Sequence, residues 1–122
     1  MAGALIKLTF DAEEVIFEEG EVGREAYIIE KGAVAISKGK AGSSVLLGCL
    51  REGEMIGEMA LIDNQPRMAT ARAMEESTLI VIPKIAFTKL KAETNPIIQV
   101  VLNTLLKRFR SESERTYIGN LG

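Results

Sequence analysis

The stretch from Gly57 to Ala71 reads G-E-M-A-L-I-D-N-Q-P-R-M-A-T-A, and its order of residues indicates a site for an anion. A glycine and a carboxylate open it, and the short apolar run that follows predicts one compact helical turn. The first N–H groups of such a turn have no partner within the helix and attract anions. A polar turn at 63–66 then leads to Arg67, whose guanidinium can hold a phosphate through charge-assisted hydrogen bonds.

Glu58 adds a hydrogen-bond acceptor at the mouth of the same turn. A carboxylate beside an anion site suits a ligand that also carries a hydroxyl, such as a phosphate joined to a sugar. Gly57 and Ala60 have little or no side chain, which lets a ligand approach the backbone closely. Taken alone, Glu58 would more often be a residue at a helix N-terminus that interacts favourably with the helix dipole. Arg67 alone would be an ordinary surface arginine. Their place within one run, nine positions apart, favours the ligand roles.

This stretch resembles the phosphate-binding cassette of the cyclic-nucleotide-binding domain family, which includes regulatory domains of cyclic-AMP receptor proteins, cyclic-nucleotide-dependent kinases and cyclic-nucleotide-gated channels. The family pattern is Gly-Glu, an apolar residue, a small residue, two apolar residues, a variable turn, and Arg followed by small residues. The sequence matches this pattern at Gly57, Glu58, Met59, Ala60, Leu61, Ile62, Pro66, Arg67, Ala69 and Thr70. The elements before and after the cassette follow the family's order, and we expect a small bacterial member.

The resemblance implies a role for individual residues. Arg67 would pair with the exocyclic oxygens of a cyclic phosphate, and Glu58 would accept from the ribose 2′-hydroxyl. Backbone N–H groups around Met59, Ala60 and Met68 would complete the cradle. The candidate cyclic-nucleotide site comprises Ile56, Gly57, Glu58, Met59, Ala60, Pro66, Arg67, Met68 and Ala69.

The ligand implied is cyclic AMP (cAMP) or cyclic GMP (cGMP). Met68 stands where some members carry Ser or Thr, whose hydroxyl can meet the guanine amino group, so cAMP is favoured. No catalytic residue, metal or other cofactor is expected. In the family the last helix caps the base and moves when the ligand binds.

Composition excludes several other function classes. The chain has 122 residues, of which 47% are hydrophobic, and a net charge of −2. These values predict one folded domain, 1–122, without a charge field that would recruit nucleic acid or a membrane. The absence of histidine removes His-dependent zinc sites and catalytic triads, so we expect no enzyme. One cysteine, no signal peptide and no membrane-length apolar run predict a cytoplasmic protein.

Short strand patterns with glycine-containing turns fill the chain up to Pro83. They predict a mainly β fold, an antiparallel β-roll (a double-stranded jelly roll) of about eight strands over about 4–83. The strand patterns at 26–29 and 33–36 flank Glu30-Lys31-Gly32, which predicts a hairpin. Alternating alanines at 69–73 predict a strand with one tightly packed face, while Tyr27 and Cys49 are expected to be buried.

Two helices are predicted after Pro83, a short one over about 84–92 and an amphipathic one over about 96–116. In the first, possible buried positions are Ile85, Phe87 and Leu90. Asn95-Pro96 is a typical helix start, with Asn as the N-cap and Pro at the first helical position. The second has an apolar stripe that is expected to pack on the core, formed by Ile98, Val101, Leu102, Leu105 and Phe109.

Two functional hypotheses follow from these patterns. The first is a regulatory module that binds a cyclic nucleotide and relays the binding through its C-terminal helices to an effector protein or to a second copy. The second is an interaction or dimerisation module of the same fold with an unused pocket. The sequence departs from fuller family members because strand pattern begins within the first few residues and no effector module follows. The chain would then be either free-standing or part of a larger protein.

Overall fold

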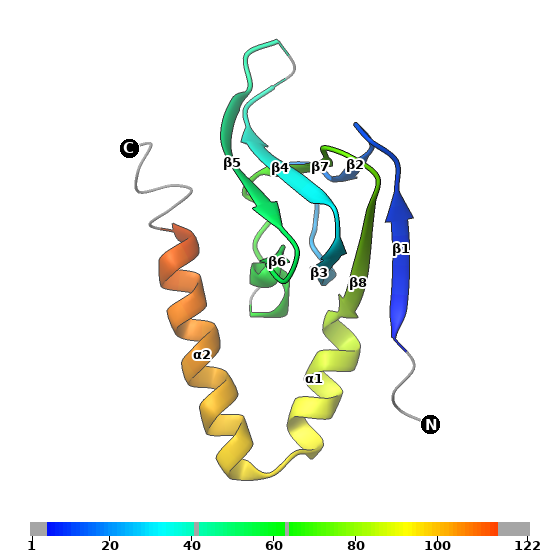
Figure 1. Ribbon diagram of the computed structural model, residues 1–122. Coiled ribbons are helices and arrows are strands. Elements are labelled where there is room, and N and C mark those ends of the chain that lie inside the picture. The colour runs from blue at the N-terminus through cyan, green and yellow to red at the C-terminus, as the bar shows by residue number, and fades with distance from the viewer. Residues whose placement is uncertain (1–4, 41, 63, 115–122) are drawn as a thin grey trace. The chain divides into compact units, whose positions relative to one another are not determined.

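The computed structural model describes residues 5–40, 42–62 and 64–114, with side chains described as far as Arg108. Strands fill the first part of the described chain and helices the second, as predicted (Figure 1). In chain order the elements are β1 (Ile6–Phe10), β2 (Val15–Phe17), β3 (Glu25–Lys31), β4 (Ala33–Lys38), β5 (Val45–Arg51), β6 (Met55–Ile56), the 3₁₀-helix η1 (Glu58–Leu61), β7 (Thr70–Ala73), β8 (Ser77–Pro83), α1 (Lys84–Glu93) and α2 (Pro96–Glu114).

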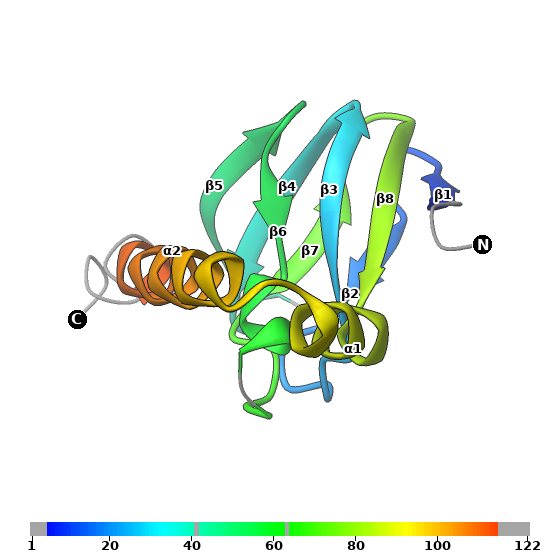
Figure 2. The ribbon, with the colours of Figure 1, turned by 90° about the horizontal axis from the view of Figure 1, so that it is seen from below.

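The eight strands named above form two four-stranded antiparallel sheets. One sheet has the order β1-β8-β3-β6 and the other has the order β2-β7-β4-β5. Figure 2 shows β6, β3, β8 and β1 side by side in the order of the first sheet. The chain forms two compact units, the first ending at Lys84 and the second beginning at Ile85. The antiparallel β-roll followed by two helices is therefore confirmed.

The chain changes sheets at Gly32, and the predicted hairpin there is wrong. β3 pairs with β8 and β6, whereas β4 pairs with β5 and β7. Gly32 has φ of 102°, so the expected positive φ is present, but the turn joins strands of different sheets. Adjacent apolar strands with a glycine between them have the same local pattern in either case, because that local pattern does not specify the partner strand. The hairpin in this region is β4–β5.

The core lies between the two sheets. Ala69, Ala71 and Ala73 are buried, which confirms the tightly packed face predicted for this strand. The buried cluster comprises Phe17, Tyr27, Ile29, Val34, Ile36, Ile56, Ala69, Ala71 and Leu79. Cys49 is exposed, contrary to prediction. Cys49 on β5 pairs with Ala35 on β4. Val34 and Ile36, on either side of Ala35, belong to the core. Because side chains alternate along a strand, Ala35 and its partner Cys49 lie on the outer face of the sheet.

The helices begin as predicted but bury less than predicted. Asn95 Oδ1 accepts from the Ile97 N–H at 2.8 Å, which confirms the N-cap of α2. α1 contains no buried residue, and Ile85 is 83% exposed. Leu90 is also exposed and Phe87 is half-buried, so the predicted core positions of α1 are wrong for Ile85 and Leu90.

The apolar stripe of α2 is not buried either. Ile98, Val101 and Leu105 are exposed and Leu102 is half-buried, while the side chain of Phe109 lies outside the described residues. An amphipathic pattern predicts an apolar face but does not say what covers it. No helix in the described part of the chain combines the length and apolarity that a membrane crossing requires.

Candidate functional site

The Gly57 end of the candidate site is a single tight turn. Gly57 has φ of 70° and ψ of 21°, a left-handed conformation that glycine adopts without a Cβ penalty. The 3₁₀-helix η1 follows directly, held by hydrogen bonds from Ala60 N to Gly57 O at 3.1 Å and from Ile62 N to Met59 O at 3.0 Å. The predicted compact helical turn is therefore present.

The backbone of Arg67 is fixed by the loop that joins β2 and β3. Arg67 N donates to Glu21 O at 2.8 Å, and Gly20 N donates to Arg67 O at 2.9 Å. Val22 and Pro66 form an isolated antiparallel bridge beside them. This short ladder sets the direction in which the Arg67 side chain leaves the backbone.

The side chain of Arg67 points into the protein and is only 8% exposed. Its Nη1 donates to Gly57 O at 3.2 Å, and its Nη2 donates to Glu25 O at 2.8 Å. Its Cζ lies 4.1 Å from the centroid of the Phe17 ring, over the ring face. The structure thus brings Arg67 onto Gly57, as the candidate site requires, and adds Phe17 and Glu25 to the group.

Two glycines leave room for the guanidinium. A Cβ at Gly23 would lie 2.9 Å from both Cζ and Nε of Arg67. A Cβ at Gly57 would lie 2.5 Å from Nη1 and 3.2 Å from Cε2 of Phe17. Because real Cβ atoms do not approach other atoms so closely, any larger residue at either position would displace the arginine.

Arg67 is a buried cation with an unused donor. Its Nε is buried without a hydrogen-bond acceptor among the described residues. Two ion pairs are formed among the described residues, Lys7–Glu30 and Lys38–Glu19, and neither of them includes Arg67. Burial lowers the pKa of Arg67, and the charges of Tyr27, Glu25, Glu21 and Glu58 act in the opposite direction. A buried N–H without a partner is costly, so this edge of the guanidinium is suited to an anionic acceptor.

The remaining predicted site residues differ in how deeply they are buried. Ile56, Glu58, Ala60 and Ala69 are buried, Glu58 being only 5% exposed. Gly57, Met59 and Met68 are half-buried, and Pro66 is exposed. The N–H of Ala60 donates to Gly57 O, so it is engaged inside the turn and is not free to complete a cradle in this structure.

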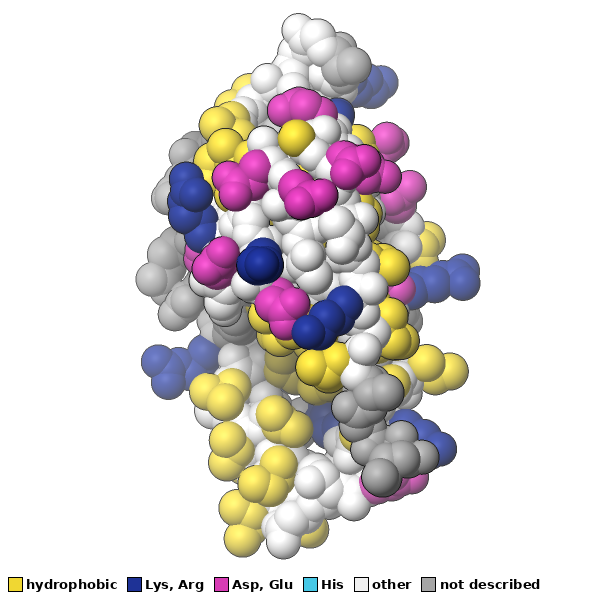
Figure 3. Space-filling model, turned by 45° about the vertical axis from the view of Figure 1, so that its right-hand side comes forward, with side chains coloured by type: hydrophobic (Ala, Val, Ile, Leu, Met, Phe, Trp, Pro, Cys, Tyr) yellow, Lys and Arg dark blue, Asp and Glu magenta, His cyan; other side chains and the backbone are white. Residues whose placement is uncertain are grey.

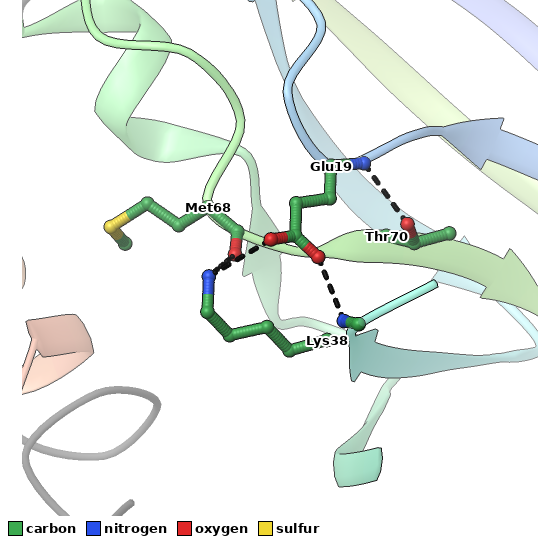
Figure 4. A network of polar contacts seen from close by, with 5 residues as sticks. Glu19, Lys38, Met68 and Thr70 are labelled. Atoms are coloured by element: carbon green, nitrogen blue, oxygen red, sulfur yellow. Dashed lines mark hydrogen bonds and ion pairs between the residues drawn. The ribbon is translucent and has the colours of Figure 1, made fainter. Parts of the chain in front are cut away.

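A polar network holds the other end of the cassette (Figure 4). Lys38 Nζ donates to Met68 O at 2.8 Å and pairs with Glu19 Oε2 at 3.1 Å. Glu19 Oε1 accepts from Gly39 N at 2.8 Å, and Glu19 N donates to Thr70 Oγ1 at 3.0 Å. The Gly39 N–H and then Lys38 lower the pKa of the Glu19 carboxyl.

Sequence reasoning missed five residues of this arrangement: Phe17, Gly23, Glu25, Glu19 and Lys38. Each lies well before the cassette in the chain, and no local sequence pattern indicates that it contacts Arg67 or Met68. Gly23 gave the only usable signal, since a glycine in a polar turn can mark close approach of other atoms. Within the described part of the chain, no group of three or more His, Cys, Asp or Glu residues could hold a metal ion.

Comparison with known proteins places this geometry in a family context. The family model described as "Cyclic nucleotide-binding domain" matches residues 7–94. The cAMP-dependent protein kinase regulatory subunit of Mucor circinelloides f. lusitanicus is 33% identical over 74% of this chain and 21% of that protein. The chain therefore spans about a fifth of that relative's length.

Solved structures agree with the family match. EAL enzyme Bd1971 in its cAMP-bound form is 39% identical, with a TM-score of 0.70 over 95% of this chain and 30% of that one. Its cGMP-bound form is 38% identical, with a TM-score of 0.70 over 91% of this chain and 30% of that one. The catabolite activator protein of Thermus thermophilus is 27% identical, with a TM-score of 0.75 over 90% of this chain and 52% of that one.

Proposed function

This chain belongs to the cyclic nucleotide-binding domain family, and from that premise we propose that its cassette binds the cyclic phosphate of cAMP or cGMP through Arg67. The observation that carries the proposal is the buried Arg67 guanidinium, whose Nε has no acceptor among the described residues. A cyclic nucleotide supplies one negative charge and two exocyclic oxygens. A charge-assisted hydrogen bond to that nitrogen would satisfy the donor and neutralise the buried cation.

Glu58 and the backbone of the cassette would hold the rest of the ligand. Glu58 is buried at the start of η1, where a carboxylate oxygen can accept from a ribose 2′-hydroxyl. Since the Ala60 N–H is engaged within the turn, we assign the remaining cradle to the backbone around Met59 and Met68. Lys38 fixes the Met68 carbonyl and so limits how the Met68–Ala69 peptide can turn.

Between the two nucleotides we propose a preference for cAMP. EAL enzyme Bd1971 has structures with either nucleotide bound, so a domain of this kind accepts both. Met68 lacks a hydroxyl that could meet the guanine amino group, which removes one contact specific to cGMP. The preference is expected to be modest, because a single neutral hydrogen bond contributes only about 0.5–1.5 kcal/mol.

The role we propose is regulatory and not catalytic. Domains of this family occur in a kinase regulatory subunit and in an EAL enzyme among the relatives above, so binding here would be read by another part or partner. α2 exposes a set of large apolar side chains, Ile97, Ile98, Val100, Val101 and Leu105, that a partner could cover. Figure 3 shows carboxylates gathered over the upper part of one face. The net charge of −2 does not favour a nucleic-acid partner.

The same exposed face of α2 favours the second candidate, an interaction or dimerisation module whose pocket is unused. The two candidates differ in their response to nucleotide. Tight self-association that is unchanged by nucleotide would support the interaction module. The relay to an effector protein or to a second copy, and the cytoplasmic location, remain predictions.

Backbone NMR tests the proposed function directly. On addition of cAMP, the amide shifts of Gly57 to Ala71 are expected to change, with Arg67 Nε–H moving downfield as it acquires an acceptor. The control ligand is 5′-AMP, which has the same base and sugar but an open phosphate, and it should cause much smaller changes. Shifts that stay unchanged at millimolar cAMP in folded protein would overturn the proposal.

A further inference from the structure

We propose that Phe17 is a positioning residue for ligand binding, because its ring face fixes the plane of the Arg67 guanidinium, the group proposed to meet the anion. This inference rests on the proposed function of the same site. It assigns to an aromatic core residue, some fifty positions before the arginine, a part in the affinity for the ligand.

The Phe17 ring is well placed for this. Phe17 is the last residue of β2 and is only 8% exposed, and the Arg67 Cζ lies 4.1 Å from its ring centroid. That distance is inside the range of about 6 Å within which a ring face attracts a cation. The ring also stacks with Tyr27, at 6.1 Å between centroids and an interplanar angle of 25°. Tyr27 is itself held, since its hydroxyl donates to Glu25 Oε1 at 2.8 Å.

Three kinds of contact together determine the pose of the guanidinium. The carbonyl oxygens of Gly57 and Glu25 each accept one N–H from an Nη atom, which fixes two directions within the guanidinium plane. The Phe17 ring face sets the tilt of that plane, and Gly23 leaves just enough space beside Cζ and Nε. Nε is then the guanidinium nitrogen that has no acceptor among the described residues.

The aromatic character of Phe17 matters apart from its volume. Burying a cation costs free energy, and the negative face of the ring offsets part of that cost. An aliphatic residue could fill the same part of the core but has no quadrupole to attract Cζ. The guanidinium would then be held by its two carbonyl acceptors alone and would sample other tilts, at the expense of ligand affinity.

The experiment replaces Phe17 with phenylalanine carrying one, two or three ring fluorines and measures the dissociation constant for cAMP by isothermal titration. Fluorine withdraws charge from the ring face while leaving the ring shape nearly unchanged. Binding should weaken in steps that follow the number of fluorines, and the whole energy of a buried cation–π contact limits the loss to roughly 30-fold. The matched control is the same series at Phe10, a partly buried aromatic packed against the same core, where affinity should stay within about twofold.

The outcomes separate this proposal from the proposed function. A graded loss at Phe17 without a loss at Phe10 supports it. Unchanged affinity across the Phe17 series, in protein whose Arg67→Ala variant no longer binds, overturns it and leaves the function standing. No binding by the unmodified protein overturns both.

A ligand-free measurement keeps the test independent of binding. The ring current of Phe17 should shift the NMR signals of the Arg67 side chain upfield in folded protein, and Phe17→Leu should remove that shift. Arg67 signals at ordinary positions in the folded protein would contradict the geometry on which the proposal rests.

Discussion

Arg67 Nη1 donates to the carbonyl oxygen of Gly57 at 3.2 Å, and a Cβ on that same glycine would come within 2.5 Å of the same nitrogen. The two ends of the cassette therefore touch through the arginine, with no space for a larger residue at the glycine. This contact explains why a glycine and an arginine ten positions apart act as one unit.

Gly57→Ala should separate stability from binding. Alanine in a left-handed conformation costs roughly 1–2 kcal/mol, and the guanidinium, at the end of a flexible side chain, should move aside from the new methyl group. We expect the free energy of unfolding to fall by this roughly 1–2 kcal/mol and the affinity for cAMP to fall by roughly tenfold or more. Gly53→Ala is the control, because Gly53 has a similar φ of 89° and nothing within 4 Å of its Cβ position. Equal cAMP affinity in the two variants would contradict the account.

Glu58→Ala should weaken binding only for ligands that carry the 2′-hydroxyl. Loss of a hydrogen bond to a charged acceptor costs about 1.5–3 kcal/mol, or roughly 10-fold or more in affinity for cAMP. For 2′-deoxy-cAMP the wild type should already bind more weakly, and the substitution should add little. Titration of both ligands into both proteins completes this cycle. A loss of the same size for the two ligands would show that Glu58 acts on the fold or the phosphate and not on the ribose.

Lys38→Met should loosen the far end of the cassette. The variant keeps an apolar stem of similar length but removes the hydrogen bond to the Met68 carbonyl and the pair with Glu19. We expect cAMP affinity to fall by about 2- to 10-fold. Lys7→Met is the control, since Lys7 on β1 forms a comparable surface pair with Glu30 on β3, outside the cassette. An affinity loss in Lys7→Met as large as that in Lys38→Met would refute a specific role for the network.

The network should also respond to acid. The pKa of Glu19 is lowered by the Gly39 N–H and by Lys38, so the folded state favours the charged carboxylate. The resulting stabilisation is present above the unfolded pKa, ordinarily about 4.5, and is lost as pH falls through the lower folded pKa. We expect the carbon-detected NMR titration of the Glu19 carboxyl to have its midpoint below 4.5. Glu19→Gln should remove this contribution to the pH dependence of unfolding, and a midpoint at or above 4.5 would contradict the contacts that Glu19 makes with Gly39 and Lys38.

Local chemistry explains what could be predicted from the sequence. The glycine-led turn, the Asn95 cap and the alternating alanines at 69–73 each depend on neighbours a few residues away, and each is present. The presence of Arg67 beside Gly57 also follows from the cassette pattern, since ten residues with one turn can bring the two together.

Long-range pairing explains what was missed. The crossing between sheets at Gly32 depends on which strands β3 and β4 choose as partners, and apolar periodicity does not specify the partner. Phe17 and Gly23 contact Arg67 across more than forty positions, and Glu25 contributes only a backbone carbonyl, which any residue type could offer. The exposure of Ile85 likewise shows that an apolar position on a helix does not define what it packs against.

We propose that Arg67 binds the phosphate of a cyclic nucleotide, and isothermal titration of cAMP and cGMP into wild type, Arg67→Ala and Arg72→Ala measures this binding. Arg72 lies on β7 and is exposed, so its removal controls for the loss of one positive charge near the cassette. We predict micromolar or tighter binding by wild type and Arg72→Ala, stronger for cAMP. Loss of a buried charge partner costs about 2–5 kcal/mol, so Arg67→Ala should bind roughly 30-fold or more weakly. Binding by Arg67→Ala equal to wild type, or no heat from folded wild-type protein with either nucleotide, would contradict the claim.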